Sequence, residues 1–135
     1  MPTKRELPVL APSRLRRAPP SFAWIDHRLR SSGLLAMLEP SEIGLYVFLV
    51  LAADKEGLSC WRLDRIEREM PCFDRGALWK ARDRLLELDL VAFRPWGAGD
   101  PDGVYQVLSI QRTGAALRPD INAALAALGR RLHMK

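Results

Sequence analysis

DRGALWKARDRLLEL, residues 74–88, carries the clearest structural signal in this 135-residue chain. Apolar residues recur in it at intervals of three and four, which predicts a helix with one buried stripe of Leu78, Ala81, Leu85 and Leu88. Asp74 is placed to cap the first turn, because its carboxylate can accept from the free backbone N–H groups there. The opposite arc holds Gly76, Trp79, Lys80, Asp83 and Glu87, with Arg75 and Arg82 at its edge.

Two further helices are predicted just before this stretch. Pro40 marks a helix start, and the apolar run 43–53 predicts a central helix that is buried on most faces and ends at Gly57. Residues 58–61 have the pattern of a short strand, and residues 63–70 that of a charged amphipathic helix, which Pro71 terminates. A tight turn then leads into the helix at 74–88.

The flanking segments are less regular. Phe22 and Trp24 alternate with small residues as in a short strand, after which Asp26 can cap a helix that runs to Leu38 and is weakened by Gly33. Residues 90–94 and 104–110 predict two strands around a turn-rich segment at 95–103, which together form a hairpin. An alanine-rich helix is predicted from residue 119 onward.

These elements predict a mainly α fold with a small β-hairpin, an α+β class. The order helix, short strand, helix, tight turn, helix, hairpin is that of a winged helix-turn-helix. We divide the chain into a flexible basic, proline-rich arm at 1–20, the winged helix-turn-helix domain at 21–112, and a C-terminal helix within 113–135.

Composition excludes several classes of protein. With 48% hydrophobic and 27% charged residues, the chain is typical of one globular domain. No apolar run reaches the roughly 18 residues of a membrane span, and no apolar segment follows Lys4 and Arg5 as a secretion signal requires. We therefore expect no membrane partner and a cytoplasmic location.

Metal binding and catalysis are not indicated. Cys60 and Cys72 lie twelve positions apart and match no zinc-ligand spacing, so we expect two unpaired, half-buried cysteines and no metal or cofactor. His27 beside Asp26 has no serine or cysteine nucleophile in a recognisable setting. The sequence predicts that the protein is not an enzyme.

The charge is unevenly distributed. The net charge is +5, but residues 1–20 hold five basic side chains against one glutamate, and residues 118–135 hold four against one aspartate. The body between them carries a net charge of about −2. If the chain binds DNA, the body must gather its positive charge on one face, and the two ends must supply much of the non-specific phosphate attraction.

The run 73–81, followed by Leu85 and by Asp89-Leu90-Val91, resembles the recognition helix and the start of the wing in GntR-type winged-helix regulators. The resemblance covers roughly residues 41–110. Position by position it implies contacts to base edges and phosphates at Arg75, Gly76, Trp79 and Lys80. Trp79 departs from that family, which usually has a small polar or basic residue there.

A longer pattern resembles a group of small bacterial helix-turn-helix proteins of mobile elements and plasmids. It comprises residues 22–27, Leu45-Tyr46 with Leu49, Ala53-Asp54, 57–59 and 105–108. This resemblance implies transcription regulation or replication control of such an element.

Four other basic residues join the predicted DNA-binding surface. Arg62 and Arg65 on the preceding helix are placed for phosphate contacts, with salt bridges to Asp64 and Glu69 as the alternative. Lys80 and Arg84 suit phosphates better than bases, or they pair along the helix with Asp83 or Glu87. Arg94 lies at the base of the wing. Trp79 is expected to pack under the wing or against a partner.

The wing and the C-terminal helix suggest protein contacts. The tip carries Asp100 and Asp102, which a minor groove would repel, so the wing is also a candidate surface for a protein partner. The C-terminal stripe of Ile121, Leu125, Leu128 and Leu132 favours homodimerisation or packing on its own domain. The sequence thus predicts a DNA-binding transcription or replication regulator. The alternative is a winged-helix protein-interaction module within a larger nucleic-acid assembly.

Overall fold

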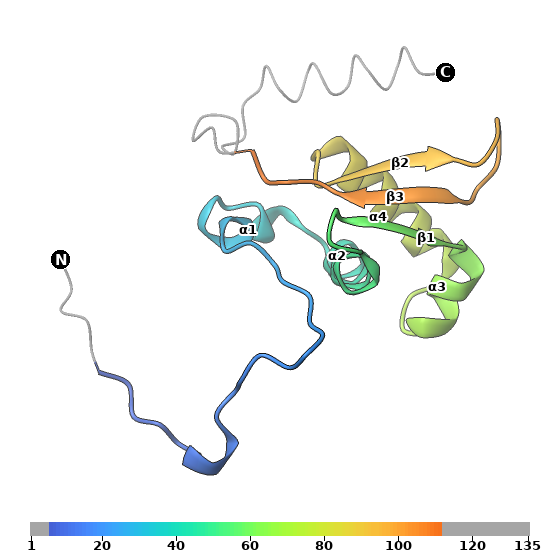
Figure 1. The fold of residues 1–135 in the computed structure, drawn as a ribbon. Helices are drawn as coiled ribbons and strands as arrows, with labels where there is room; N and C mark the ends of the chain where they lie inside the picture. The colour runs from blue at the N-terminus through green and yellow to red at the C-terminus, as the bar shows by residue number, and fades with distance from the viewer. Residues whose placement is uncertain (1–5, 112–135) are drawn as a thin grey trace.

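A hairpin and one strand from earlier in the sequence form a three-stranded antiparallel sheet in the computed structural model, which describes residues 6–111 (Figure 1). The strands β1 (Leu58–Trp61), β2 (Val91–Pro95) and β3 (Gly103–Val107) lie in the order β1-β3-β2. The predicted hairpin is therefore β2 and β3, and β1 adds a third strand on its other side. The fold is α+β, as the sequence predicted.

Side-chain alternation gives the sheet one packed face. The register places Ser59 and Phe93 on either side of Tyr105, and the rings of Phe93 and Tyr105 lie 4.8 Å apart. Neighbours on the other face, such as Cys60 and Arg94, are exposed. Because successive strand residues point to opposite faces, this pattern fixes the register of the sheet.

Four α-helices precede or interrupt the strands: α1 (Arg28–Ser31), α2 (Pro40–Ala52), α3 (Leu63–Glu69) and α4 (Arg75–Glu87). The core forms where α2 and α4 meet each other and the packed face of the sheet. Its fully buried side chains include Leu45, Leu49, Ile66, Leu78, Leu85 and Tyr105. No helix within residues 6–111 is long and apolar enough to cross a membrane.

Helix α2 differs in part from the predicted central helix. Leu45 and Leu49 on one side are buried, but Val47 and Leu51 on the other are 37% and 68% exposed. The other residues from Ser41 to Ala52 are buried or partly buried, so the prediction of a central buried helix is confirmed apart from the exposed line through Val47 and Leu51. The sequence of α2 is nevertheless apolar on both sides.

The segment before α2 also differs from its prediction. Phe22 and Trp24 are exposed and form no strand, because no neighbouring strand pairs with them. The predicted helix to Leu38 is two short pieces, α1 and the 3-10 helix Leu35–Met37. Gly33 separates them with a φ of +89°, a left-handed conformation that glycine adopts without steric cost.

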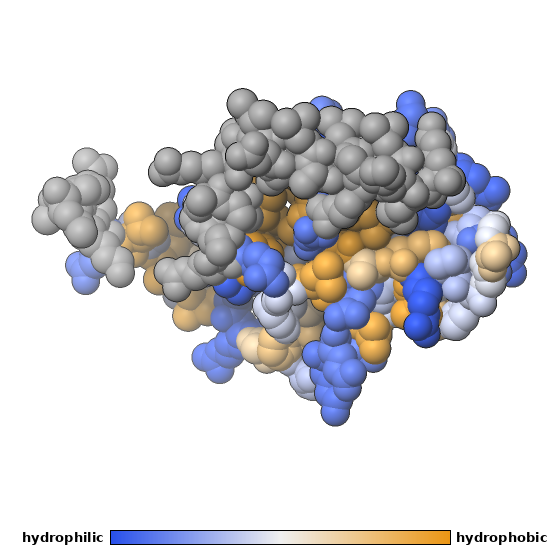
Figure 2. Space-filling view, turned by 90° about the horizontal axis from the view of Figure 1, so that it is seen from above, coloured by the Kyte–Doolittle hydropathy of each residue, from blue (hydrophilic) through white to orange (hydrophobic). Residues whose placement is uncertain are grey.

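The structure describes most of the N-terminal segment but no residue beyond 111. Residues 6–20 are extended apart from the 3-10 helix Pro12–Arg14, and all are exposed. The exposed large hydrophobic residues of this segment include Leu7 and Leu10. Figure 2 shows hydrophobic surface at the left of the molecule, beside the grey N-terminal residues. The predicted C-terminal helix, with its stripe of Ile121, Leu125, Leu128 and Leu132, lies outside the described residues.

Candidate functional site

The first two turns of α4 present the predicted contact residues to solvent. Arg75, Gly76, Trp79 and Lys80 are exposed, while Leu78, Ala81 and Leu85 on the opposite side are at most 1% exposed. The carboxylate of Asp74 caps this end by accepting from the backbone N–H of Ala77 at 2.7 Å. The amphipathic spacing alone therefore separates the outer surface of α4 from the core.

The turn before α4 is fixed against α2. Gly44 leaves room there for the ring of Phe73, since a Cβ at this position would lie 2.5 Å from a ring carbon of Phe73. The backbone N–H of Phe73 also donates to the carbonyl of Met70 at 3.1 Å. These contacts set where α4 begins relative to α3, and hence where its exposed turns point.

The two basic residues at the start of α4 are accessible. Nε of Arg75 lies 3.8 Å from a carboxylate oxygen of Glu67 on α3, and the Arg75 side chain is 60% exposed. An exposed pair at this distance is weak, so a stronger anion can replace the carboxylate. Within residues 6–111, Lys80 has no ion-pair partner.

The predicted arginines of α3 lie in different surroundings. Arg62 precedes the helix, and its Nε lies 3.3 Å from a carboxylate oxygen of Asp64. Arg62 therefore forms the salt bridge that the sequence offered as the alternative to a phosphate contact. The Arg65 guanidinium lies 5.9 Å from the centre of the Trp61 ring, which itself packs on Phe48 of α2. Arg65 is thus beside β1 and α2, whereas Arg75 is linked to α3 through Glu67.

Arg84 and Arg94 are separated from the α4 N-terminus. Arg84 is half-buried two turns further along α4 and pairs with Glu87 at 3.4 Å, one of the two partners expected for it. Arg94 is exposed near the end of β2, on the open face of the sheet. Of the eight predicted residues, four lie together on the first two turns of α4, namely Arg75, Gly76, Trp79 and Lys80. Arg62 and Arg65 lie at the neighbouring helix α3.

Arg82 is buried, which the sequence analysis did not predict. It was expected at the edge of the exposed arc, but it is only 6% exposed and its guanidinium lies against two rings, 4.1 Å from Trp79 and 4.4 Å from Phe93. The signal was present, because position 82 is four residues after Leu78 and three before Leu85. That spacing puts it on the border of the buried stripe.

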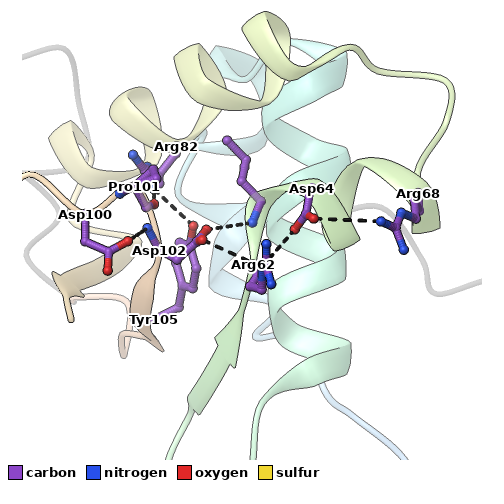
Figure 3. A network of polar contacts seen from close by, with 9 residues as sticks. Arg62, Asp64, Arg68, Arg82, Asp100, Pro101, Asp102 and Tyr105 are labelled. Carbon is purple, nitrogen blue, oxygen red and sulfur yellow. Dashed lines mark hydrogen bonds and ion pairs between the residues drawn. The ribbon is translucent and has the colours of Figure 1, made fainter.

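Arg82 joins α4 to the hairpin (Figure 3). Nη1 donates to the carbonyl oxygen of Pro101 at 2.8 Å and to the hydroxyl oxygen of Tyr105 at 3.2 Å. Burial raises the pKa of Tyr105, so its hydroxyl stays protonated at neutral pH. Trp79 was expected to pack under the wing, and it contacts this junction through the Arg82 guanidinium.

The hairpin carboxylates are turned toward the protein. Asp102 accepts from the backbone N–H of Leu63 at 2.9 Å and lies 4.0 Å from Nε of Arg62, while Asp100 accepts from the backbone N–H of Asp102 at 2.9 Å (Figure 3). The sequence indicated that these carboxylates would repel a minor groove, and it did not predict that they would bond within the protein. Their short side chains instead satisfy backbone donors at the start of α3 and in the hairpin turn.

Replacing Arg82 by Met is expected to reduce the free energy of unfolding by about 2–3 kcal/mol. Hydrogen bonds to charged groups contribute roughly 1.5–3 kcal/mol, and the variant leaves the Pro101 carbonyl without this donor. Urea denaturation followed by circular dichroism measures the change. Arg84→Met on the same helix is the matched control, and we expect it to alter stability by less than about 1 kcal/mol because its ion pair is partly exposed. Equal effects of the two variants would contradict the role given to Arg82.

The free cysteines and a large cavity are distinct from the predicted contact residues of α4. Cys60 and Cys72 are free and exposed, so the expectation of half-buried cysteines was wrong. No cluster of three or more His, Cys, Asp or Glu side chains in residues 6–111 is arranged to hold a metal. A cavity of about 650 Å³ lies between residues 22–28, the end of α2 and residues 106–110, and none of the predicted contact residues lines it.

Comparisons with protein-family models, characterised proteins and solved structures gave no significant match.

Proposed function

We propose that this chain is a winged helix-turn-helix protein that binds double-stranded DNA, with α4 as the helix that enters the major groove. The observation that carries the proposal is the exposure of Arg75, Gly76, Trp79 and Lys80 on the first two turns of α4. In helix-turn-helix proteins the N-terminal residues of the second helix contact base edges. Gly76 has only the Asp74 carboxylate near it, at 3.4 Å from a built Cβ, so the backbone of α4 is open to a close partner here.

The arrangement around α4 supports the same proposal. A pair of helices joined by a short turn, followed by a hairpin paired with an earlier strand, is the architecture of winged helices. Arg62 just before α3 and Arg65 on it are exposed and available to the phosphate backbone, and Arg94 is exposed in the wing. Because Asp100 and Asp102 are engaged within the protein, they weigh less against an approach of the wing to DNA than the sequence suggested.

In this proposal the protein regulates transcription or replication, in keeping with the resemblance to helix-turn-helix proteins of mobile elements. Arg75 is the first choice for a bidentate contact to guanine, and Lys80 for a phosphate. The basic N-terminal segment adds sequence-independent attraction, since Arg14, Arg16 and Arg17 are exposed there.

A salt titration tests whether the body itself binds DNA. We expect the affinity for a random duplex, measured by fluorescence anisotropy, to fall with salt at a logarithmic slope of about −0.9 for each phosphate neutralised. Removal of residues 1–20 should weaken binding and reduce the slope but leave measurable affinity. If all binding disappears with those residues, or if the full chain binds no DNA, the body has no DNA surface and the proposal fails.

A protein-interaction module is the second candidate, and Trp96 favours it. This side chain stands at the hairpin turn and is 64% exposed, which is unusual for a tryptophan without a partner. Aromatic residues of this kind often anchor protein interfaces. Retention of a protein partner by nuclease-treated chain, lost on Trp96→Ala, together with no DNA affinity at moderate salt, would select this function over the first.

A further inference from the structure

The cavity at the end of α2 has the size of a small-molecule binding site. Its volume is about 650 Å³, and pockets that enclose small ligands measure roughly 300–1,000 Å³. One wall is the side of α2 that carries Tyr46, Val50 and Ala53, which follow one another at intervals of four and three. Residues 22–28, the turn 54–57 and residues 106–110 at the end of β3 provide the other walls.

A buried hydroxyl group lies at this cavity. Tyr46 is only 3% exposed and lines the cavity, and among residues 6–111 its hydroxyl has no hydrogen-bond partner. Buried hydroxyl groups normally have a partner, because burial removes their hydrogen bonds to water. Burial and the charge of Asp26, which lines the same cavity, raise the pKa of Tyr46, so the phenol is neutral at pH 7. It can therefore both donate to and accept from a bound molecule.

Two exposed aromatic side chains also line the cavity. Phe22 is 65% exposed and Trp24 74%, and the aliphatic side chains of Val50, Val107 and Ile110 belong to the same lining. An exposed apolar patch bordered by polar residues is typical of a ligand-binding groove. Aromatic faces stack on other rings and attract cations, because the face of the ring carries partial negative charge.

The charges along the cavity favour a cation over an anion. Its lining holds three carboxylates and two basic side chains. Arg28 is already engaged, since its Nε and Nη2 donate to Asp26 at 2.9 and 2.6 Å. Lys55 is the other basic residue, and Asp54 and Glu56 flank it in the turn after α2. A cation at this turn is therefore attracted by a net negative charge, which repels an anion.

Hydrogen bonds fix this turn in place. A carboxylate oxygen of Asp54 accepts from the backbone N–H groups of Glu56 at 2.8 Å and Leu58 at 2.9 Å. The backbone N–H of Val107 on β3 donates to the carbonyl oxygen of Gly57 at 2.8 Å. Because these walls are already ordered, a ligand does not have to organise the turn when it binds.

We propose that this cavity binds a small aromatic amine whose ring carries a hydrogen-bonding group. The ring lies against Phe22 and Trp24, its polar group bonds to the Tyr46 hydroxyl, and the ammonium group lies at the carboxylates of the turn 54–57. None of the predicted contact residues of α4 lines the cavity. The proposal is therefore independent of DNA binding by α4.

Isothermal titration calorimetry of the full chain with three indole compounds tests the proposal. Tryptamine, tryptophol and indole-3-acetate share one ring and are a cation, a neutral molecule and an anion at neutral pH. We expect tryptamine to bind at least about tenfold more tightly than indole-3-acetate, with tryptophol between them, because the net negative rim distinguishes their charges. No binding of tryptamine at millimolar concentration, as when another part of the chain fills the cavity, or equal affinity for all three, would overturn the proposal.

Two tyrosine variants locate the bound molecule. Tyr46→Phe should weaken tryptamine binding about fivefold, the effect of one lost hydrogen bond, and should leave the urea midpoint unchanged. Tyr105→Phe is the matched control, because its hydroxyl accepts from Arg82 at 3.2 Å and Tyr105 does not line the cavity. This control should lower the urea midpoint and leave the affinity for tryptamine unchanged. If Tyr46→Phe binds tryptamine as tightly as the unchanged chain, the hydroxyl is not part of a ligand site and the proposal fails.

A charge variant tests the place of the ammonium group. Glu56→Gln should weaken tryptamine binding about threefold or more and leave tryptophol binding unchanged, because only tryptamine carries a charge. Glu69→Gln on α3, which is also exposed and lies outside the cavity, is the control and should change neither affinity. Equal effects of Glu56→Gln and Glu69→Gln would contradict a cation held at the turn 54–57.

Discussion

The double variant Arg75→Glu/Lys80→Glu is expected to bind DNA at least about 100-fold more weakly than the unchanged chain. Loss of one good base or phosphate contact costs roughly 1–3 kcal/mol, and each 1.4 kcal/mol is a factor of ten in affinity. Reversal goes further than removal, because two carboxylates are then placed against the phosphates. Fluorescence anisotropy with a duplex at fixed, moderate salt measures the change.

The fold should survive this double variant. Arg75 and Lys80 are exposed, and among residues 6–111 the one ion pair that is lost is the 3.8 Å contact between Arg75 and Glu67. Surface changes of this kind usually alter stability by no more than about 0.5 kcal/mol. Circular dichroism and urea denaturation check this point, so that a loss of binding is not mistaken for unfolding.

A charge-matched comparison separates a local contact from an effect of net charge. Arg30→Glu on α1 changes the net charge as much as Lys80→Glu does, and Arg30 is also exposed. We expect Arg30→Glu to reduce affinity less than threefold and Lys80→Glu to reduce it at least tenfold. If the two single variants weaken binding equally, the α4 surface is not the contact and the assignment of the recognition helix must be abandoned.

Elements with strong local signals could be predicted from the sequence. The period of Leu78, Ala81 and Leu85 predicts α4 and its buried side, and Asp74 predicts where it begins, because both depend on neighbours within the helix. The strand at 58–61 was predicted with its observed bounds. Its pairing with β3 was not predicted, since strand partners depend on contacts between residues far apart in the chain.

The errors concern side chains whose environment comes from another element. Helical spacing placed Arg82 at the edge of the exposed arc, but the hairpin covers it and supplies the Pro101 carbonyl and the Tyr105 hydroxyl as partners. Asp102 was judged by its place near the hairpin tip, but the free N–H of Leu63 at the start of α3 draws it inward. Periodicity gives the face of a residue on its own element and says nothing of which polar groups approach it.

The outer side of α2 was misjudged for a related reason. An apolar helix predicts burial, but the sequence does not show which other helices and strands pack against it. Of the apolar side chains on α2, those of Leu45 and Leu49 are covered by α4 and the sheet, and that of Leu51 is not.

Replacing Gly103 by Ala is expected to destabilise the protein by about 3 kcal/mol or more, the largest change in stability among our predictions. Gly103 begins β3 and is buried, between Trp61 of β1 and Pro95 of β2. A Cβ there would overlap the carbonyl oxygen of Arg94 and lie 2.6 Å from Cα of Pro95. Both are backbone atoms of the paired strand, so the clash cannot be relieved by a side-chain rotation and the strands must separate locally.

Gly97→Ala in the same hairpin is the matched control. A Cβ at Gly97 meets no atom within 4 Å, and Gly97 is not among the glycines with a positive φ, so this change should be neutral or slightly stabilising. Urea denaturation of the two variants gives the comparison directly. Separation of the strands at Gly103 would also displace Asp102 from the N–H of Leu63, and thereby loosen the start of α3 as well as the wing. We therefore expect Gly103→Ala to weaken DNA binding even at temperatures where the variant stays folded. If Gly103→Ala and Gly97→Ala are equally stable, the close approach of β2 and β3 at Gly103 is not required.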